Sequence, residues 1–348
     1  MASAQAPLRL ATPVLADIPV ALRRPVAKLA VVIPALNEAA SVGSVISAVP
    51  RKIDGVGRVE VILVDDGSTD STQQVALAAG ADAIVRHTQR RGLVAAFKSG
   101  VAEAMRRGAN VVVHLDADGQ HDPMLIPHLI EPILGYDADL VLGVRAFSGG
   151  AEDMSPIRRY GNIAGTWVMG RVIGLDISDA TTGYRAFTRE ALMRLNVVSD
   201  YTYTLETLIE AARKQLSVTE VPIEVRTRLA GESRMTHSIM RYVRRTGGQA
   251  FSALIRQHLV GILLRLAVVF LALAGTASVW FVLGYQHDGV GRHLPALLAA
   301  VLSTTASIGF FVTGLLASAI DSSRRLLEDA LYHVKCIELG VGHGGEGR

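Results

Sequence analysis

Residues 59–70 read VEVILVDDGSTD, and this stretch decides the class of fold. Val59–Val64 is apolar at all but one position, which predicts a buried strand of a parallel sheet that is covered on both faces. The strand ends in Asp65 and Asp66, and two carboxylates at a strand tip suit a ribose or an electropositive base edge. The alternative is that residues 68–70 only cap the next helix, which leaves the aspartate pair unexplained.

Further apolar strands alternate with helical segments on both sides of that stretch. The expected strands are Lys28–Ile33, Val59–Val64, Ala83–Arg86, Asn110–Leu115 and Leu140–Val144. The expected helices are Ser41–Val49, Thr69–Ala79, Gly92–Arg107, Leu125–Leu134 and Tyr203–Lys214, with Ser41 as the N-cap of the first. This alternation predicts an α/β domain with a mostly parallel sheet, in which ligands bind beyond the carboxyl ends of the strands.

Residues 110–122, NVVVHLDADGQHD, bring a second acidic group to a strand end. Asp116, Asp118 and Gln120 alternate, so an extended chain places the three side chains on one face. Their oxygens are hard ligands, and Mg²⁺ or Mn²⁺ can use one or two carboxylates together with phosphate oxygens. The alternative is a polar turn in front of Pro123.

Motifs and composition exclude several classes of protein. The first strand continues into residues 34–38, PALNE, rather than G-x-G-x-x-G, and the chain has no G-x-x-x-x-G-K-[ST], so neither a dinucleotide-binding site nor a P-loop is expected. The single cysteine, Cys336, cannot close a disulfide or build a cysteine zinc site. Aromatic residues make up 5% of the chain and the formal net charge is +3, so no nucleic acid is expected as a partner.

Two long uncharged runs lie in the C-terminal third of the chain. Leu266–Gly284 has 19 residues, which is about 28 Å as a helix, and residues 294–320 form a second run of 27. Polar residues 285–293 connect them. Runs of this length predict a transmembrane hairpin in a lipid bilayer. Small residues in the spans, such as Gly275 and Ala277, are compatible with a homo-oligomer.

Positive charge is concentrated beside these runs. Residues 234–286 contain six arginines and no acidic residue. Arg324, Arg325 and Lys335 follow the second run, whereas the connection holds only Arg292. Because positive residues favour the cytoplasmic side, we expect a cell-membrane protein whose N-terminal domain and both termini are cytoplasmic.

The predicted organisation has five parts. They are a flexible tail over residues 1–27, an α/β domain over 28–232, basic juxtamembrane helices over 233–258, a transmembrane hairpin over 259–320 and a cytoplasmic tail over 321–348. The first tail has four prolines between residues 7 and 25 and no long apolar core, so it is not expected to be a signal peptide. The basic helices are expected to lie on the anionic leaflet.

Three motifs occur in an order and at spacings that are typical of one enzyme family. They are PALNE at 34–38, VDDGSTD at 64–70 and DADGQHDP at 116–123. They resemble the motifs of the family 2 glycosyltransferases of GT-A fold, and most closely those of the dolichyl-phosphate mannose synthase and polyprenyl-phosphate glycosyltransferase branch. The resemblance covers about residues 29–236 and includes GVR at 143–145, RRYGN at 158–162, DATTGYRA at 179–186, EVPI at 220–223 and GESR at 231–234.

The resemblance implies a role for each matching residue. The nucleotide sugar is expected to contact Pro34, Leu36, Glu38, Val64, Asp65, Asp66, Asp116, Ala117, Asp118, Arg145, Arg228 and Arg234. The expected metal ligands for Mg²⁺ or Mn²⁺ are Asp116, Asp118 and Gln120, which form the catalytic group together with Arg145. The acceptor phosphate is expected to contact Arg158, Arg159, Asn162 and Arg185.

Some of these positions leave alternatives open. Leu36 departs from the family, in which an aromatic residue is common, so the resemblance does not decide between guanine and uracil. Asp179 and Arg185 could instead shape the acceptor loop. Glu206 could be an acceptor-side carboxylate or only a residue on the face of its helix.

The implied reaction is inverting transfer of a hexose from GDP-mannose or UDP-glucose to a polyprenyl phosphate, such as undecaprenyl or dolichyl phosphate. The acceptor phosphate is already anionic near neutral pH, so no strong general base is needed. One alternative is a family 2 enzyme that acts on a lipid hydroxyl or a cell-envelope polysaccharide, although neither Trp167 nor Trp280 belongs to the Q-x-x-R-W motif of processive relatives. A second alternative is a catalytically silent membrane scaffold, which the intact acidic motifs disfavour.

Overall fold

The computed structural model describes residues 24–145, 170, 174, 177–197, 203–224, 239–288 and 290–340. The chain divides into two compact units, one formed by Met1–His237 with Val334–Arg348 and the other by Ser238–His333. Nearly all of the expected N-terminal tail, residues 1–23, lies outside the described residues. The same holds for residues 341–348.

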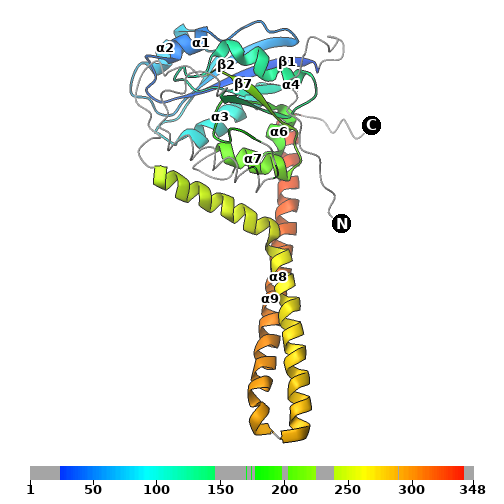
Figure 1. Cartoon of the computed structure of the whole chain (residues 1–348). Helices are drawn as coiled ribbons and strands as arrows, with labels where there is room; N and C mark the ends of the chain where they lie inside the picture. The colour runs from blue at the N-terminus through cyan, green and yellow to red at the C-terminus, as the bar shows by residue number, and fades with distance from the viewer. Residues whose placement is uncertain are drawn as a thin grey trace. The chain divides into compact units, whose positions relative to one another are not determined.

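Unit 1 is built on a seven-stranded sheet with the order β3-β2-β1-β4-β6-β5-β7 (Figure 1). The strands are β1 (Val26–Ala35), β2 (Val56–Asp65), β3 (Ala83–Arg86), β4 (Val111–His114), β5 (Leu140–Arg145), β6 (Arg185–Thr188) and β7 (Val218–Ile223). Neighbouring strands are parallel except that β6 is antiparallel to both β4 and β5. The predicted mostly parallel α/β sheet is confirmed, but the sequence analysis does not predict β6 or β7.

Helices cover both faces of this sheet. They are α1 (Val42–Ser47), α2 (Thr72–Ala78), α3 (Leu93–Arg106), the 3₁₀ helix η3 (Pro123–Leu125), α4 (Ile126–Leu134), α6 (Arg189–Arg194) and α7 (Tyr203–Arg213). Helices α1, α2, α3, α4 and α7 occupy predicted segments, and α6 is an addition. Helices α1, α2 and α4 lie on one side of the sheet and α3 and α7 on the other (Figure 1).

The alternation of side chains along β1 explains these layers. Leu29, Val31 and Ile33 belong to the buried apolar cluster that includes residues of α1, α2 and α4. The opposite face carries Val32, against which α3 packs so closely that a Cβ on Gly100 would lie 2.2 Å from Val32 Cγ1. Glycine at this position therefore allows α3 to approach the sheet.

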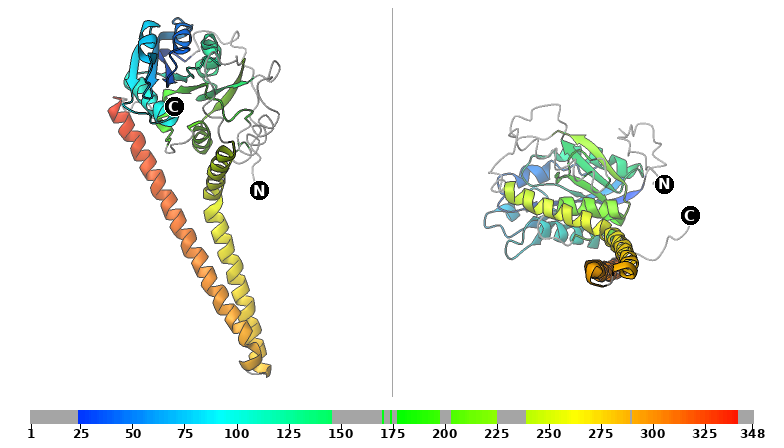
Figure 2. Two further views of the ribbon diagram at one scale, coloured as in Figure 1. Left: turned by 90° about the vertical axis from the view of Figure 1, so that its left-hand side faces the viewer. Right: turned by 60° about the horizontal axis from the view of Figure 1, so that its bottom comes forward.

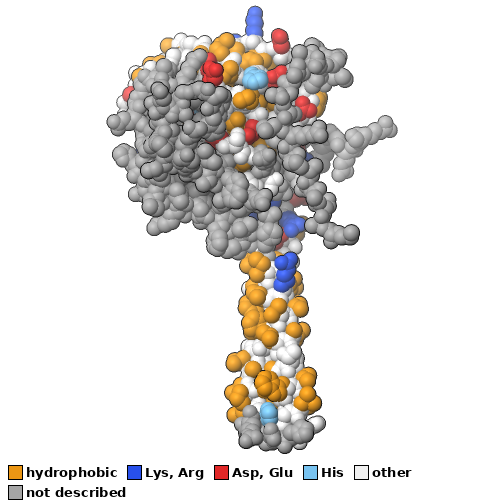
Figure 3. Space-filling model, in the orientation of Figure 1, with side chains coloured by type: hydrophobic (Ala, Val, Ile, Leu, Met, Phe, Trp, Pro, Cys, Tyr) orange, Lys and Arg blue, Asp and Glu red, His pale blue; other side chains and the backbone are white. Residues whose placement is uncertain are grey.

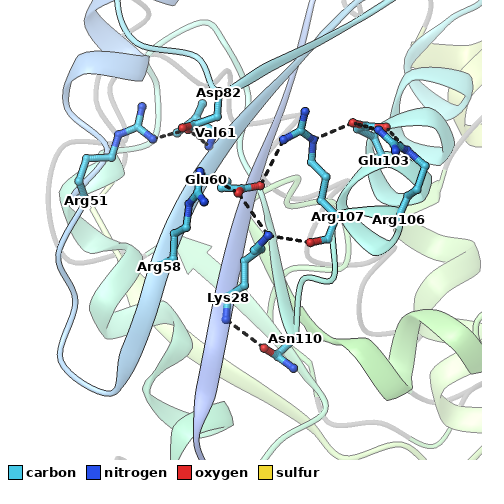
Figure 4. Close-up of polar contacts among 10 residues, drawn as sticks. All are labelled: Lys28, Arg51, Arg58, Glu60, Val61, Asp82, Glu103, Arg106, Arg107 and Asn110. Carbon is cyan, nitrogen blue, oxygen red and sulfur yellow. Dashed lines mark hydrogen bonds and ion pairs between the residues drawn. The ribbon is translucent and has the colours of Figure 1, made fainter. Parts of the chain in front are cut away.

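One charged residue, Glu60, interrupts the apolar run of β2, and it is only 2% exposed. It lies near the amino end of the strands, where Lys28 Nζ approaches its carboxylate to 3.3 Å and Arg58 to 3.1 Å (Figure 4). Arg107, just after the end of α3, contributes a third cation at 3.6 Å. This network neutralises Glu60 and lies at the edge of the sheet opposite to the acidic strand tips.

Unit 2 is made of two long helices, α8 (Ile239–Asp288) and α9 (Val290–Glu338), although residues 334–338 of α9 are grouped with unit 1. The two helices form an antiparallel pair, and only residue 289 separates them in the sequence (Figure 2). Ser307 Oγ donates a hydrogen bond of 2.7 Å to the carbonyl of Ala267. The rings of Phe270 and Phe310 pack with their centroids 5.4 Å apart.

The surface of this helix pair is apolar (Figure 3). Leu259–Gly284 and His293–Glu338 are long and apolar enough to cross a membrane, and 11% of the most apolar window of each is buried. Large side chains such as Trp280, Leu302 and Ile320 are 67–70% exposed. Because contiguous exposed apolar surface of this extent marks an interaction or membrane surface, the pair points to membrane association.

One detail of the predicted C-terminal region is wrong. Residues 285–293 are not a polar connecting loop, because α8 continues to Asp288 and α9 already begins at Val290. Residues 321–338 of the expected tail are helical as part of α9. Several polar residues, such as Gln, Arg, Lys and Glu, have helix propensities close to that of Leu, so the limits of an apolar run do not mark the ends of the helix. The expected basic segment is helical from residue 239 onward and is continuous with the first span.

Candidate active site at the carboxyl edge of the sheet

The order of the strands locates a crevice at the carboxyl ends of β1 and β4. Strand β1 pairs with β2 on one side and with β4 on the other, so the chain winds in opposite directions from this point. Such a switch point is where open α/β sheets bind ligands. The segment 34–38 includes the last two residues of β1 and the start of the loop that follows it. Ala35, at the end of β1, pairs with Asp65 at the end of β2.

The loops after β1 and β2 are fastened to each other. The Asn37 amide donates to Ser68 Oγ at 2.9 Å, and the Thr69 amide donates to Asn37 Oδ1 at 2.8 Å. The amide of Glu38 donates to Thr72 Oγ1 at 2.9 Å. Ser68 and Thr69, which follow the aspartate pair, thus join the loop after β2 to the loop after β1. Their role is therefore larger than capping the next helix.

The expected cap of α1 behaves differently from the prediction. Ser41 occupies the N-cap position, but its side chain accepts no helix amide. Its Oγ instead donates to Glu38 Oε2 at 3.0 Å. Ser41 therefore orients Glu38, an expected nucleotide contact, at the rim of the crevice.

The aspartates at the tip of β2 are buried and bound by protein donors. Asp65 is fully buried and accepts from the Ser68 amide at 2.9 Å and from the Gln73 side chain. Asp66, which is 5% exposed, accepts three hydrogen bonds of 2.8 Å. Their donors are His87 Nδ1 and the amides of Arg91 and Gly92. The other ring nitrogen of His87, Nε2, lies 2.9 Å from Ser99 Oγ.

This arrangement gives Asp66 a role that the sequence analysis did not anticipate. Its carboxylate connects the tip of β2 to the loop in front of α3. The loop also packs tightly on Gly67, where an added Cβ would lie 2.9 Å from the amide nitrogen of Arg90. The expected contacts of Asp65 and Asp66 with base or ribose stay predictions.

The segment after β4 is a turn rather than an extended strand. Gly119 has a φ of +74°, and the Gln120 amide donates to Asp118 Oδ1 at 3.0 Å. The expectation that alternation places Asp116, Asp118 and Gln120 on one face of an extended chain is therefore wrong. A glycine in the left-handed region allows the chain to reverse, and the aspartate side chain closes the turn.

The carboxylates of this turn fit a divalent cation that is shared with a phosphate ligand. Asp116 is partly exposed, and Asp118 is buried beside it in the same turn. Among the described residues, no group of three or more His, Cys, Asp or Glu is arranged to hold a metal by itself. Mg²⁺ is commonly bound by one or two carboxylates with substrate phosphates, so two aspartates are a sufficient protein contribution.

An aromatic cluster packs beneath Asp116. His114 at the end of β4 is fully buried, and burial lowers its pKa to about 4, so the ring is neutral. Tyr203, the first residue of α7, lies with its hydroxyl 2.9 Å from His114 Nδ1, and burial raises its pKa well above the usual value. The sequence analysis assigned no role to either residue, because their proximity depends on strand order.

Arg185 is placed in the interior rather than on a phosphate-binding surface. It is fully buried, and its guanidinium donates to the carbonyls of Thr182, Ala180 and Thr204 and to Thr207 Oγ1 at 2.6–3.0 Å. The expectation that Arg185 contacts the acceptor phosphate does not agree with this burial. The structure supports the alternative, in which Arg185 shapes the loop before β6.

Asp179 and Glu220 hold the other end of that loop. Asp179 is fully buried and accepts from Thr181 through both the amide and the hydroxyl. Glu220 on β7 accepts from the amide and the hydroxyl of Ser178 at 2.7 and 2.6 Å. Burial raises the pKa of Glu220, and the nearby charge of Asp179 adds to this effect.

The remaining predicted residues divide into two groups. Pro34, Leu36, Val64 and Ala117 lie at the ends of β1, β2 and β4, and Glu206 lies partly exposed in the first turn of α7. The side chains of Arg145, Arg158, Arg159, Asn162, Arg228 and Arg234 lie outside the described residues. The structure therefore brings the strand-tip residues together, and the arginine contacts stay predictions.

A mostly parallel sheet with acidic strand tips at its switch point agrees with the GT-A type of fold. Residues 30–195 match the family model described as glycosyl transferase family 2. The chain belongs to this family and is a glycosyltransferase.

The relatives include lipid-phosphate mannosyltransferases. Polyprenol monophosphomannose synthase of Mycolicibacterium smegmatis is 33% identical over an alignment that covers 63% of this chain and 84% of the relative. Undecaprenyl-phosphate mannosyltransferase of Micrococcus luteus is 32% identical, with coverage of 60% and 88%. Among solved structures, glucosyl-3-phosphoglycerate synthase of Mycobacterium tuberculosis, in complex with Mn²⁺, UDP and glucosyl-3-phosphoglycerate, has a TM-score of 0.51 and 25% identity, covering 66% of this chain and 79% of that one.

Proposed function

We propose that this chain transfers a hexose, with inversion, from GDP-mannose or UDP-glucose to a polyprenyl phosphate. The observation that carries the proposal is the presence, in one chain, of the Asp116–Asp118 turn at the β1/β4 crevice and of two helices able to cross a membrane. The mannosyltransferase relatives, whose names specify polyprenol and undecaprenyl phosphate, support the same acceptor class.

Asp116 and Asp118 would hold Mg²⁺ or Mn²⁺ together with the diphosphate of the donor, and Gln120 is a further proposed ligand. The metal would neutralise negative charge that develops on the departing nucleoside diphosphate. A Mn²⁺ and UDP complex of the structural relative supports a divalent ion in this class of site. The loops after β1 and β2 would orient the nucleoside through residues 34–38 and the Asp65–Asp66 tip.

Arginine residues, together with Asn162, would bind the phosphate groups of the donor and of the acceptor. We propose that Arg145, Arg228 and Arg234 contact the donor diphosphate, and that Arg158, Arg159 and Asn162 contact the acceptor phosphate. Arginine suits these roles because its planar guanidinium can form two parallel hydrogen bonds to a phosphate. The acceptor oxygen is anionic and can attack the anomeric carbon directly, so an in-line displacement would invert that carbon.

The hairpin would bring the acceptor to the enzyme by residing in the same bilayer. We propose a location in the cell membrane with unit 1 and both termini in the cytoplasm, in keeping with the basic residues that flank the spans. Holding the two reactants in one place lowers the entropic cost of their encounter.

The test uses purified membranes or detergent-solubilised full chain with a panel of sugar nucleotides. Undecaprenyl phosphate, dolichyl phosphate and phosphoglyceric acid serve as acceptors, and products are identified by mass. We expect a lipid-phosphate hexose, absent for Asp118→Ala and present for Asp54→Ala, in which an exposed aspartate is changed. Near-normal transfer by Asp118→Ala would overturn the metal assignment, and a product formed only on phosphoglyceric acid would overturn the lipid acceptor.

A further inference from the structure

Tyr203 occupies a rigid position under the proposed metal site. It is 1% exposed. Its ring stacks on Phe97 of α3, with the centroids 4.3 Å apart and the planes inclined by 12°. The ring of His114 packs against both aromatic rings, at 5.5 Å from Phe97 and 4.9 Å from Tyr203. Packing alone therefore fixes the direction in which the Tyr203 hydroxyl points.

The hydroxyl belongs to a closed triangle of polar atoms. Tyr203 Oη lies 2.9 Å from His114 Nδ1 and 3.3 Å from the carbonyl oxygen of Gly183, and His114 Nδ1 lies 3.0 Å from the same carbonyl. The carbonyl can only accept, so all three contacts are favourable if Nδ1 carries a proton and the hydroxyl donates to Gly183. For the buried His114 Nε2 no hydrogen-bond partner exists among the described residues, which fits an unprotonated nitrogen there.

Gly183 connects this triangle to Asp116. A Cβ built on Gly183 would lie 2.9 Å from Asp116 Oδ2 and 3.3 Å from Tyr203 Oη. The Gly183 Cα therefore packs closely against both the carboxylate and the phenol, and a displacement of this backbone would change the space available to Asp116. Arg185, two residues later, anchors the same loop through the carbonyls of Thr182 and Ala180.

We propose that Tyr203 is a positioning residue for the metal site. Through His114 and the carbonyl of Gly183, its hydroxyl holds the Gly183 backbone against Asp116 and thereby sets the position of that carboxylate toward Mg²⁺ or Mn²⁺ and the donor diphosphate. The inference rests on the metal role of Asp116 in the proposed function. Outer residues that orient metal ligands typically change metal affinity by about 10–100-fold when they are replaced.

The experiment measures Mn²⁺ binding directly. The purified full chain in detergent is titrated with Mn²⁺ in the presence of UDP and, separately, of GDP, and free Mn²⁺ is followed by electron paramagnetic resonance. Tyr203→Phe keeps the stacked ring and removes only the hydroxyl, and Gly183→Ala places a Cβ 2.9 Å from Asp116 Oδ2. Tyr184→Phe is the matched control, because it removes the hydroxyl of a fully buried tyrosine whose own hydrogen bond, to Asp122, is 3.4 Å long.

We expect Tyr203→Phe and Gly183→Ala to bind Mn²⁺ about tenfold or more weakly than wild type, while Tyr184→Phe binds it normally. Transfer by Tyr203→Phe should recover at high Mn²⁺, which a general loss of folding would not allow. Wild-type Mn²⁺ affinity in Tyr203→Phe, or in Gly183→Ala if the first variant does not fold, overturns the inference, as does a wild-type chain that binds no Mn²⁺. If wild type makes no lipid-phosphate hexose but the affinity difference persists, the proposed function fails and the positioning role stands.

Discussion

The tips of β2 and β4 both end in paired aspartates, yet they are built in different ways. At β2, Asp65 and Asp66 are buried and accept hydrogen bonds from loop amides and from two side chains. At β4, a turn at Gly119 follows a partly exposed Asp116. The β2 pair is therefore held by protein donors, and we expect the partly exposed Asp116 at β4 to be the carboxylate that meets a ligand.

The strongest test of this contrast is Asp116→Asn. The change keeps the shape of the side chain and removes a charge that would hold the metal. We expect kcat to fall by about 10²–10³-fold, the usual cost of losing one electrostatic contact to the departing group, with a melting temperature close to that of wild type. Hexose transfer and thermal unfolding measured on the same preparation check both parts. A large drop in melting temperature would show that Asp116 is structural like Asp66.

The reverse pattern is expected for Asp66→Asn. One asparagine oxygen cannot satisfy the imidazole of His87 and the amides of Arg91 and Gly92, and its NH₂ group would face a donor. Leaving a buried donor unsatisfied costs about 1–3 kcal/mol, so chemical denaturation should show a loss of that size in the free energy of unfolding. Asp54→Asn, at an exposed aspartate, should show none. Unchanged stability would mean that the three hydrogen bonds do not hold the loop.

A third variant tests the contact between the β2 tip and the loop in front of α3 without changing any charge. Gly67 has a φ of +83°, and an added Cβ would lie 2.9 Å from Arg90 N. Gly67→Ala should therefore reduce the free energy of unfolding by about 1–3 kcal/mol for the strained backbone position, and by a further amount for the contact with Arg90 that Gly108→Ala lacks. Gly108→Ala is the matched control, since Gly108 has a φ of +81° but nothing within 4 Å of its added Cβ. Equal losses in the two variants would remove the steric argument and leave only backbone strain.

The sequence predicted the parts of the fold that local patterns determine. The apolar run Val59–Val64 predicts a buried strand because β2 is covered on both faces. The apolar segments of α8 and α9 are predictable because each is long enough to cross a membrane. Strand β6 is not predicted because it is short and begins with Arg185, a charged residue whose burial depends on the nearby carbonyl of Thr182 and on the carbonyl of Thr204, 19 residues away.

The candidate site was predictable only as far as its strand tips. The Asp118–Gly119 dipeptide is itself a turn signal. This signal outweighs the alternation of Asp116, Asp118 and Gln120, and it agrees with the observed turn. His87 and Tyr203 carry no such signal, because they reach Asp66 and His114 across 21 and 89 residues of chain. Their roles follow from strand order, which a single sequence does not specify.

The smallest expected effect concerns the acidic pair that supports the loop beside the β4 tip. Burial, with the charge of Asp179, raises the pKa of Glu220 above its value of 4.5 in the unfolded chain. The folded state therefore binds a proton more tightly than the unfolded state does, and stability decreases as the pH rises from about 4.5 through the folded-state pKa. Glu220→Gln should flatten this part of the profile of unfolding free energy against pH, whereas Glu190→Gln, at a largely exposed glutamate, should not. An unchanged profile in Glu220→Gln would mean that this loop, like the β2 tip, is held by hydrogen bonds whose strength does not depend on a buried proton.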